Sequence, residues 1–280
     1  MEIFSVGLLP NSKRNSSFTV ISVGGSLIAP KDGIDTVFLK TFKETIINQV
    51  EKKGMKFVIV CGGGKTARDY QGAYKAVNPN VSDFDLDFMG IYATKLNAQL
   101  MANIFKDVAD PEIIENPNEN IFTNYSIVVA GGWEPGCSTD YDAVLLALNV
   151  GAKRIINLSN IDGVYDGDPK KVDKVKMFRE ISWDDYLKLI PDKWKPGLSS
   201  PFDPVASEKA KEKGVEVFIT NGNQIENMES YLESGFFHSG TLIKGGASLK
   251  FECFACSDRP IEYRMHSSGS ICLYLPPPQK

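Results

Sequence analysis

Short runs of apolar and β-branched residues alternate along the chain with longer segments in which hydrophobic residues recur every three or four positions. The short runs predict strands at residues 20–23, 57–60, 127–130, 154–158 and 215–220. The longer segments predict helices at residues 35–53, from about 66, about 85–109, 138–150, 203–213 and 224–234. Strands that alternate with helices are typical of a mostly parallel sheet covered on both faces. The pattern therefore predicts an α/β fold.

The alternation is interrupted in two places. Residues 184–201 contain several prolines and predict a loop-rich segment, and the alternation stops at about residue 247. We expect an N-terminal extension over residues 1–17 and one domain over residues 18–245. Residues 246–280, with a serine- and glycine-rich stretch and three consecutive prolines, predict an atypical, poorly ordered tail.

Composition and charge narrow the class of protein. Hydrophobic residues make up 42% of the 280 residues, which allows a sizeable core and excludes a disordered chain. The formal net charge of −4 argues against a dedicated nucleic-acid-binding protein. No apolar run reaches the roughly 20 residues that span a bilayer, so we expect no membrane association. The thinly spread cysteines, 5 in number, indicate reduced thiols, and the lack of a signal peptide indicates a cytoplasmic protein.

The cysteines, histidines and acidic residues do not predict a metal site. Cys253 and Cys256 form a lone C-x-x-C pair, and their spacing to His266 and Cys272 matches no zinc pattern. The aspartates of the loop after residue 159 lack the spacing of an EF-hand. These aspartates, Asp162, Asp166 and Asp168, either form turns or contact a nucleotide or Mg²⁺.

Three of the predicted strands run directly into glycines, at Gly24-Gly25, Gly62-Gly63-Gly64 and Gly131-Gly132. In a parallel sheet such turns lie at one edge, where the strands end. Glycine allows backbone N–H groups to approach an anion, and the N-terminus of the next helix adds a favourable dipole. Three turns of this kind indicate a polyphosphate along the edge of the sheet. A P-loop is excluded, because Ile59 stands where that motif needs its first glycine.

Polar residues close to these glycines each have two interpretations. Lys65 and Arg68 share a helix face and either bind phosphate or are solvated. The aspartates that precede the helix at about 85–109 either cap it or, in the case of Asp87, bind sugar hydroxyls. Ser138 either caps the next helix or helps to hold a second anion.

Seven segments, taken in order, resemble the amino acid kinase family and within it the archaeal-like uridylate (UMP) kinases. They are VGGSLI (23–28), CGGGKTAR (61–68), DFMGIYATKLNAQL (87–100), AGGWEPGCSTDYDAVLLA (130–147), LSNIDGVYDGDPKK (158–171), PFDPVASEKA (201–210) and HSGTLI (238–243). The third and fourth favour uridylate kinases over carbamate, acetylglutamate or aspartate kinases. The resemblance implies a three-layer α/β sandwich whose N-terminal half binds UMP and whose C-terminal half binds ATP.

The resemblance also implies roles for individual residues. The UMP site would comprise Gly63, Asp87 on the ribose, and Trp133, Glu134, Pro135, Gly136, Cys137, Ser138 and Thr139. The ATP site would comprise Gly25, Ser26, Gly64, Arg68, Ser159, Asn160, Tyr165 and Asp168. Arg68 would be catalytic, Asp203 would organise the active site and Asp140 would support it.

The implied activity is transfer of the γ-phosphoryl group of ATP to UMP, in the presence of Mg²⁺. Another small-molecule kinase of the family and a non-catalytic nucleotide sensor are the alternatives. Many members of the family carry lysine where this chain has Ser22, so Lys65, Arg68 and Mg²⁺ are the candidates for positive charge. The resemblance further implies a homo-oligomer, a hexamer. The apolar helix at 35–53 is either an interface or part of the core.

Overall fold

A computed structural model describes residues 18–167, 174–191, 200–245, 263–265 and 271–273. The chain falls into two units, Met1–Ala247 and Ser248–Lys280. In the second unit, β8 (Tyr263–Met265) and β9 (Ile271–Leu273) pair antiparallel. The C-x-x-C pair and His266 lie outside the described residues. The first unit contains the α/β fold.

A seven-stranded sheet forms the centre of the first unit, in the order β3-β2-β1-β4-β6-β7-β5. Its strands are β1 (Phe18–Val23), β2 (Lys56–Cys61), β3 (Ile127–Ala130), β4 (Arg154–Ser159), β5 (Glu180–Ser182), β6 (Glu216–Asn221) and β7 (Thr241–Lys244). The first five in spatial order run parallel, and β7 is antiparallel to β6. These features confirm the predicted mostly parallel sheet.

The register of the central strands brings their carboxyl ends to one level. Val23 of β1 lies opposite Cys61 of β2 and Leu158 of β4. The next residues along each strand are therefore neighbours at one edge of the sheet. Because β2 lies on one side of β1 and β4 on the other, β1 is the point where the strand order reverses. Ligands of open α/β sheets bind at such a point.

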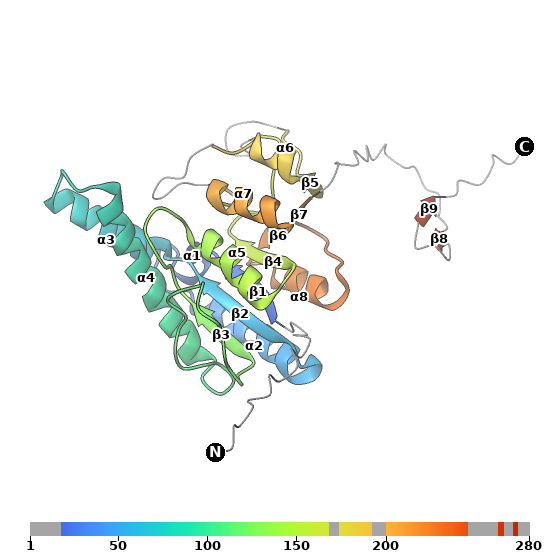
Figure 1. The fold of residues 1–280 in the computed structure, drawn as a ribbon, viewed down its shortest axis with the longest axis horizontal. Helices are drawn as coiled ribbons and strands as arrows, with labels where there is room; N and C mark the ends of the chain where they lie inside the picture. Colours follow the sequence, from blue (N-terminus) through green and yellow to red (C-terminus); the bar gives the residue numbers. More distant parts are fainter. Residues whose placement is uncertain (1–17, 168–173, 192–199, 246–262, 266–270, 274–280) are drawn as a thin grey trace, which may run out of the picture. The chain divides into compact units, whose positions relative to one another are not determined.

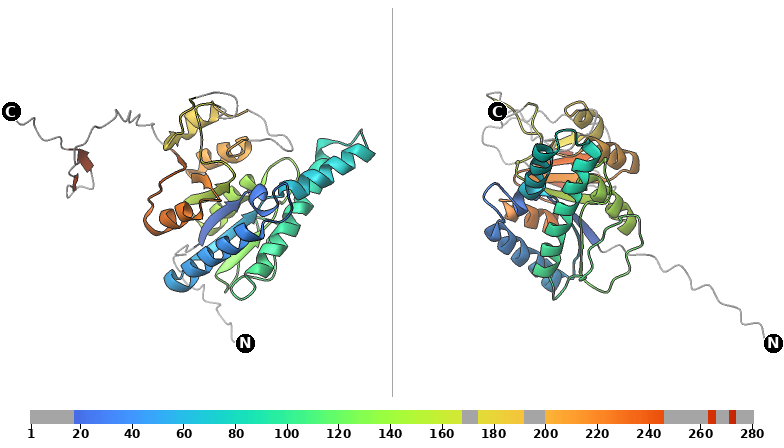
Figure 2. Two further views of the ribbon diagram at one scale, coloured as in Figure 1. Left: turned by 180° about the vertical axis from the view of Figure 1, so that it is seen from behind. Right: turned by 90° about the vertical axis from the view of Figure 1, so that its left-hand side faces the viewer.

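Helices cover both faces of the sheet, which gives three layers (Figure 1). One face packs against α1 (Gly25–Ile28), α2 (Thr36–Lys53), α4 (Asp83–Ile104) and α8 (Ile225–Ser234). The other packs against α5 (Thr139–Val150), α6 (Trp183–Leu187) and α7 (Pro204–Lys213). The remaining helix, α3 (Gly64–Val77), has no buried residue, and with the first part of α4 it projects beyond the sheet (Figure 2).

Helix α2 shows why the sequence pattern worked. Asp35 caps it by accepting hydrogen bonds from two backbone N–H groups of the first turn, and Gly54 ends it with a positive φ of 63°. Phe42 and Ile46 are fully buried in the core. Of the two interpretations of this helix, the core is therefore the one observed.

Several boundaries differ from the prediction. Helix α3 begins at Gly64, earlier than expected, and α4 ends at Ile104 because Ala109 pairs with Ile127 of the sheet. The segment predicted as loop-rich begins in a helix, since Tyr186 lies in α6 and is fully buried. Elements as short as α1, β5 and α6 have too few residues to show a hydrophobic period. None of the helices in the described ranges is both long and apolar enough to cross a membrane.

Candidate active site

The glycine turns after β1 and β2 are packed directly against each other. A Cβ atom on Gly25 would lie 2.0 Å from the backbone nitrogen of Gly64, and one on Gly64 would lie 2.1 Å from the carbonyl oxygen of Gly25. Gly64 also has a positive φ of 61°. No other residue fits at these two positions. The absence of side chains leaves backbone N–H groups at the start of α3 able to approach an anion.

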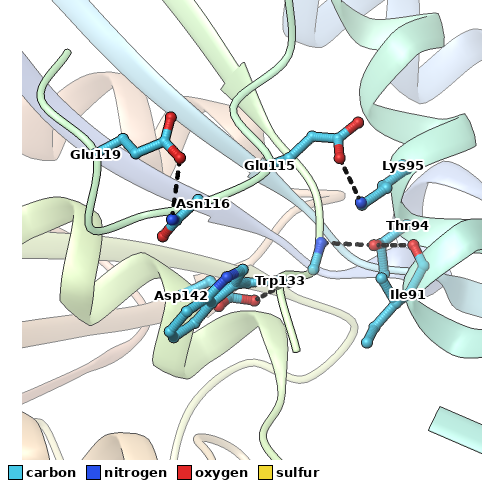
Figure 3. A network of polar contacts seen from close by, with 9 residues as sticks. Ile91, Thr94, Lys95, Glu115, Asn116, Glu119, Trp133 and Asp142 are labelled. Carbon is cyan, nitrogen blue, oxygen red and sulfur yellow. Dashed lines mark hydrogen bonds and ion pairs between the residues drawn. The ribbon is translucent and has the colours of Figure 1, made fainter. Parts of the chain in front are cut away.

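The third glycine turn, after β3, lies against α4. Gly132 donates its N–H to the hydroxyl of Thr94 over 2.6 Å, and that hydroxyl donates to the carbonyl of Ile91 over 2.6 Å (Figure 3). A Cβ atom on Gly131 would lie 3.0 Å from the Cα atom of Lys95. Glycine at both positions thus allows the chain to pass close to the helix.

These elements surround a cleft with a volume of about 190 Å³. Its lining residues come from the start of α3, from α4, from the loop between β3 and α5, and from the first turn of α5. They are Gly63, Gly64, Ala67, Arg68, Gln71, Asp87, Gly90, Ile91, Thr94, Gly132, Trp133, Glu134, Cys137, Ser138, Thr139 and Asp142. All but two of the residues expected for UMP are in this set, the exceptions being Pro135 and Gly136. Asp142 also lines the cleft, although no sequence motif predicted a role for it.

The two basic residues of α3 have different surroundings. Arg68 is exposed and lines the cleft. Lys65 forms an ion pair with Asp69, one helical turn further on, over 2.6 Å. Arg68 is therefore the basic residue of this helix turn that faces the cleft.

Asp87 is a buried carboxylate on the side of the cleft that α4 forms. Only 8% of it is exposed, and its Oδ2 accepts the N–H of Gly136 over 2.9 Å. Burial raises the pKa of Asp87, and the Gly136 amide partly offsets that rise. The cap of α4 is Ser82, which forms a capping box with Asp85. Asp87 is thus not the cap of its helix.

The loop between β3 and α5 is held at several backbone N–H groups. Trp133 donates its N–H to Oδ2 of Asp142 over 3.3 Å (Figure 3). The N–H groups of Gly132 and Gly136 are held by Thr94 and Asp87. Ser138 caps α5, because its hydroxyl accepts the N–H of Asp140 over 3.2 Å. Burial raises the pKa of Cys137 to about 12, so its thiol stays protonated at neutral pH.

Asp140 joins four elements at the carboxyl edge of the sheet. Its Oδ1 accepts from the hydroxyl of Ser22 on β1 and from the amide of Asn157 on β4, each over 3.2 Å. Its Oδ2 accepts the N–H of Asp203 over 3.2 Å. Burial, together with the neighbouring Asp203 carboxylate, raises the pKa of Asp140 to about 7.

Asp203 caps α7, since its Oδ1 accepts the N–H of Ala206 over 2.8 Å. Burial raises the pKa of Asp203, and the Ala206 amide partly offsets the rise. Tyr186 fixes the preceding residue: its hydroxyl donates to the carbonyl of Phe202 over 2.8 Å and accepts the N–H of Phe202 over 2.7 Å. The sequence pattern did not predict a role for Tyr186, which lies in a segment predicted to be a loop.

The residues expected for ATP lie mainly on the other side of β1. Ser159 ends β4, and Asn160 and Tyr165 lie in the loop after it. Asp162 of that loop accepts from the side-chain amide of Asn221 on β6 over 2.8 Å and from the hydroxyl of Tyr165 over 3.4 Å, so it ties the loop to the sheet. Gly25 and Ser26 begin α1, directly beside Gly64. Asp168 lies outside the described residues.

The possible metal-ligating side chains do not gather into a cluster in the described residues. Within the described part of the chain, no group of three or more His, Cys, Asp or Glu side chains is arranged to hold a metal ion. A metal bound mainly by phosphate oxygens would need only one or two protein carboxylates.

The sequence is similar to that of known proteins over most of its length. Residues 17–221 match the amino acid kinase family. A uridylate kinase of Methanocorpusculum labreanum is 34% identical over 235 residues, which is 83% of this chain and 97% of the relative. One from Methanothermobacter thermautotrophicus is 34% identical over 75% of this chain and 92% of its own length.

Solved structures give the same result. The uridylate kinase of Archaeoglobus fulgidus superposes with a TM-score of 0.68 at 28% identity, over 80% of this chain and 99% of its own. The UMP kinase of Bacillus anthracis superposes with a TM-score of 0.64 at 20% identity, over 82% of this chain and 97% of its own, and shows the shared fold. The sequence match and the arrangement of glycine turns agree: the chain belongs to the amino acid kinase family.

Proposed function

We propose that the chain transfers the γ-phosphoryl group of ATP to the α-phosphate of UMP and releases UDP and ADP. Its archaeal uridylate kinase relatives support this reaction. The single observation that carries the proposal is the cleft at the carboxyl edge of the sheet. There the GGG turn, the DFMG helix and the PGCSTD loop, far apart in sequence, line one cavity.

For the UMP side, we propose that the N–H groups around Gly63 hold the nucleotide. Gly64 and Arg68, expected for ATP, line the same cleft and would bind the transferring phosphates. A guanidinium group presents a planar pair of donors to phosphate oxygens. Asp87 would bind the ribose hydroxyls through Oδ1, since Oδ2 already accepts from Gly136. The loop from Trp133 to Thr139 would hold the rest of the nucleotide.

For the ATP side, we propose that Gly25 and Ser26 bind phosphate and that the end of β4 with its following loop, Ser159, Asn160, Tyr165 and Asp168, binds the base and sugar. Asp140 and Asp203 would organise the region between the two substrates. Their mutual contact and their links to β1 and β4 support such a role. The N-terminal and C-terminal halves of a domain over residues 18–245 would then each bind one nucleotide.

The chemistry requires little from the protein beyond positioning and charge. The attacking UMP oxygen is already anionic, so neither a general base nor a phosphorylated enzyme is needed. The backbone N–H groups and Arg68 offset the repulsion between the two phosphates and hold them in line. Mg²⁺ would enter as part of the substrate MgATP, and no step is assigned to a protein-bound ion.

We propose that the chain forms a homo-oligomer, a hexamer by family resemblance, and that α4 carries a contact surface. Four exposed apolar side chains recur every fourth residue on this helix, at Phe84, Phe88, Tyr92 and Leu96. They form a stripe about 18 Å long at 1.5 Å per residue. An exposed apolar patch of this kind marks an interaction site. We also propose a cytoplasmic location, which the free thiols of Cys61 and Cys137 support.

The test is an assay of ADP release with UMP, CMP, AMP, carbamate and acetylglutamate, each with and without Mg²⁺. We expect turnover with UMP in the presence of Mg²⁺. Activity on carbamate or an amino-acid derivative, with none on UMP, would reject the assignment. Binding of UMP and ATP without turnover would identify a nucleotide sensor instead.

A further inference from the structure

The loop between β3 and α5 forms one side of the cleft, and its path depends on three hydrogen bonds to side chains. Gly132 donates to Thr94 and Gly136 donates to Asp87, both on α4. Trp133 donates to Asp142, on α5, over 3.3 Å. Asp142 is therefore the residue that ties the loop to the second face of the sheet (Figure 3).

Asp142 is placed where a carboxyl group is costly. Only 2% of the residue is exposed, and its Oδ1 is buried without a hydrogen-bond partner among the described residues. Burial raises its pKa to about 8, and the charges that act on it, those of Glu134, Asp140 and Asp203, are all acidic. A single amide hydrogen bond does not offset such a burial.

Part of the surroundings of Asp142 is apolar. Leu146, one turn further along α5 on the same side, is fully buried in the core. Replacing an incompletely paired buried polar group by an apolar group of the same shape is often neutral or stabilising. The stability of the fold therefore does not explain the carboxyl group, whereas its contact with the loop does.

We propose that Asp142 is a positioning residue that holds Trp133, and through it the first part of the loop, in the conformation that binds the acceptor nucleotide. That the nucleotide is UMP rests on the proposed function. Trp133 lines the cleft and is half-buried, so a shift at its N–H changes the wall that the ligand meets. Asp142 acts through this N–H and is not itself a ligand of the substrate.

Two substitutions separate positioning from stability. Asp142→Leu keeps the branching at Cγ and removes the acceptor, whereas Asp142→Asn keeps an oxygen that can accept the Trp133 N–H. The matched control is Asn149→Ala at the other end of α5, because Asn149 also holds a loop, through the carbonyls of Pro117 and Glu119. If Asp142→Leu does not fold, Asp142→Ala takes its place.

We expect Asp142→Leu to raise the KM for UMP by about tenfold, the effect of about 1.4 kcal/mol, and the KM for ATP by less than about twofold. Hydrogen exchange of the backbone amides of Gly132, Trp133, Glu134 and Gly136 in the ligand-free protein should become faster, and the melting temperature should not fall. Asp142→Asn should keep both the KM for UMP and the slow amide exchange of the unsubstituted protein. Asn149→Ala should leave both unchanged.

The exchange measurement needs no substrate, so it decides the role of Asp142 even if the chain does not phosphorylate UMP. Unchanged exchange of the loop in Asp142→Leu would overturn the proposal. So would an equal rise in both KM values with a lowered melting temperature, which would assign Asp142 to the fold. Fast exchange of the loop amides in Asp142→Asn would also overturn it.

Discussion

The hydroxyl group of Ser22 donates a hydrogen bond to Oδ1 of Asp140 over 3.2 Å. Ser22 occupies the position where many members of the family carry a lysine. The other donors to the Asp140 carboxylate are the side-chain amide of Asn157 and the backbone N–H of Asp203, so all three are neutral. The Asp140 carboxyl group is therefore buried and hydrogen-bonded, and position 22 supplies no positive charge to it. Burial and the neighbouring Asp203 carboxylate raise its pKa to about 7.

A dependence of stability on pH follows. In the unfolded chain the carboxyl groups of Asp140 and Asp142 have a pKa of 3.8, and in the folded protein the values are about 7 and about 8. Between these limits the folded state binds more protons, so the free energy of unfolding falls as the pH rises. Each group contributes a slope of up to about 1.4 kcal/mol per pH unit.

Urea unfolding at several pH values between about 5 and 8 measures this slope. Asp142→Asn should have a smaller slope and should be more stable than the unsubstituted protein at the upper end of the range. Equal slopes in the two proteins would contradict the raised pKa of Asp142.

Arg68→Ala should lower turnover by about 10² to 10³, because one charge contact to the transferring phosphates is lost. The fold should be intact, since Arg68 is exposed. Initial rates from the ADP-release assay and a thermal melt measure the two effects. Lys75→Ala, an exposed basic residue in the last turn of the same helix, is the control and should have a normal rate. A normal rate in Arg68→Ala would remove Arg68 from the mechanism.

Asp87→Ala should raise the KM for UMP more than the KM for ATP. The substitution removes the carboxylate proposed for the ribose and also the acceptor of the Gly136 N–H. Loss of a hydrogen bond to a charged group costs about 1.5–3 kcal/mol, so we expect a rise of about tenfold or more. Asp83→Ala, which removes an exposed carboxylate one turn earlier on α4, is the control. Equal changes in both KM values would contradict the division into two nucleotide sites.

The combined substitution of Tyr92→Lys and Leu96→Lys should reduce the molar mass in solution, because it places charge on the exposed stripe of α4. Each of these side chains is 62% exposed in the isolated chain, so the fold should tolerate the change. Light scattering after size exclusion measures the mass. Phe122→Lys, at an exposed aromatic residue in the loop before β3, is the control. An unchanged mass in the double variant would move the contact surface away from α4.

The hydrophobic pattern was sufficient for the elements that bury one complete face. Helix α2 and strands β2 and β3 lie where the pattern predicted them, because each is long or apolar enough to express its own period. The pattern failed for α6, which is five residues long and buried through Trp183 and Tyr186. In so short a segment the burial is decided by contacts with distant residues, such as that of Tyr186 with Phe202.

By itself, the sequence determined the alternation of strands and helices, the glycine turns and, through motifs, the family. These features are local, since glycine, helix caps and hydrophobic periods act over a few residues. The tertiary structure alone decided which polar groups meet. Ser22 and Asp140 are 118 positions apart, and Gly136 and Asp87 are 49 apart. Such contacts depend on the register of strands and the packing of helices, which bring distant residues to within a hydrogen bond of each other and leave no periodic signal in the chain.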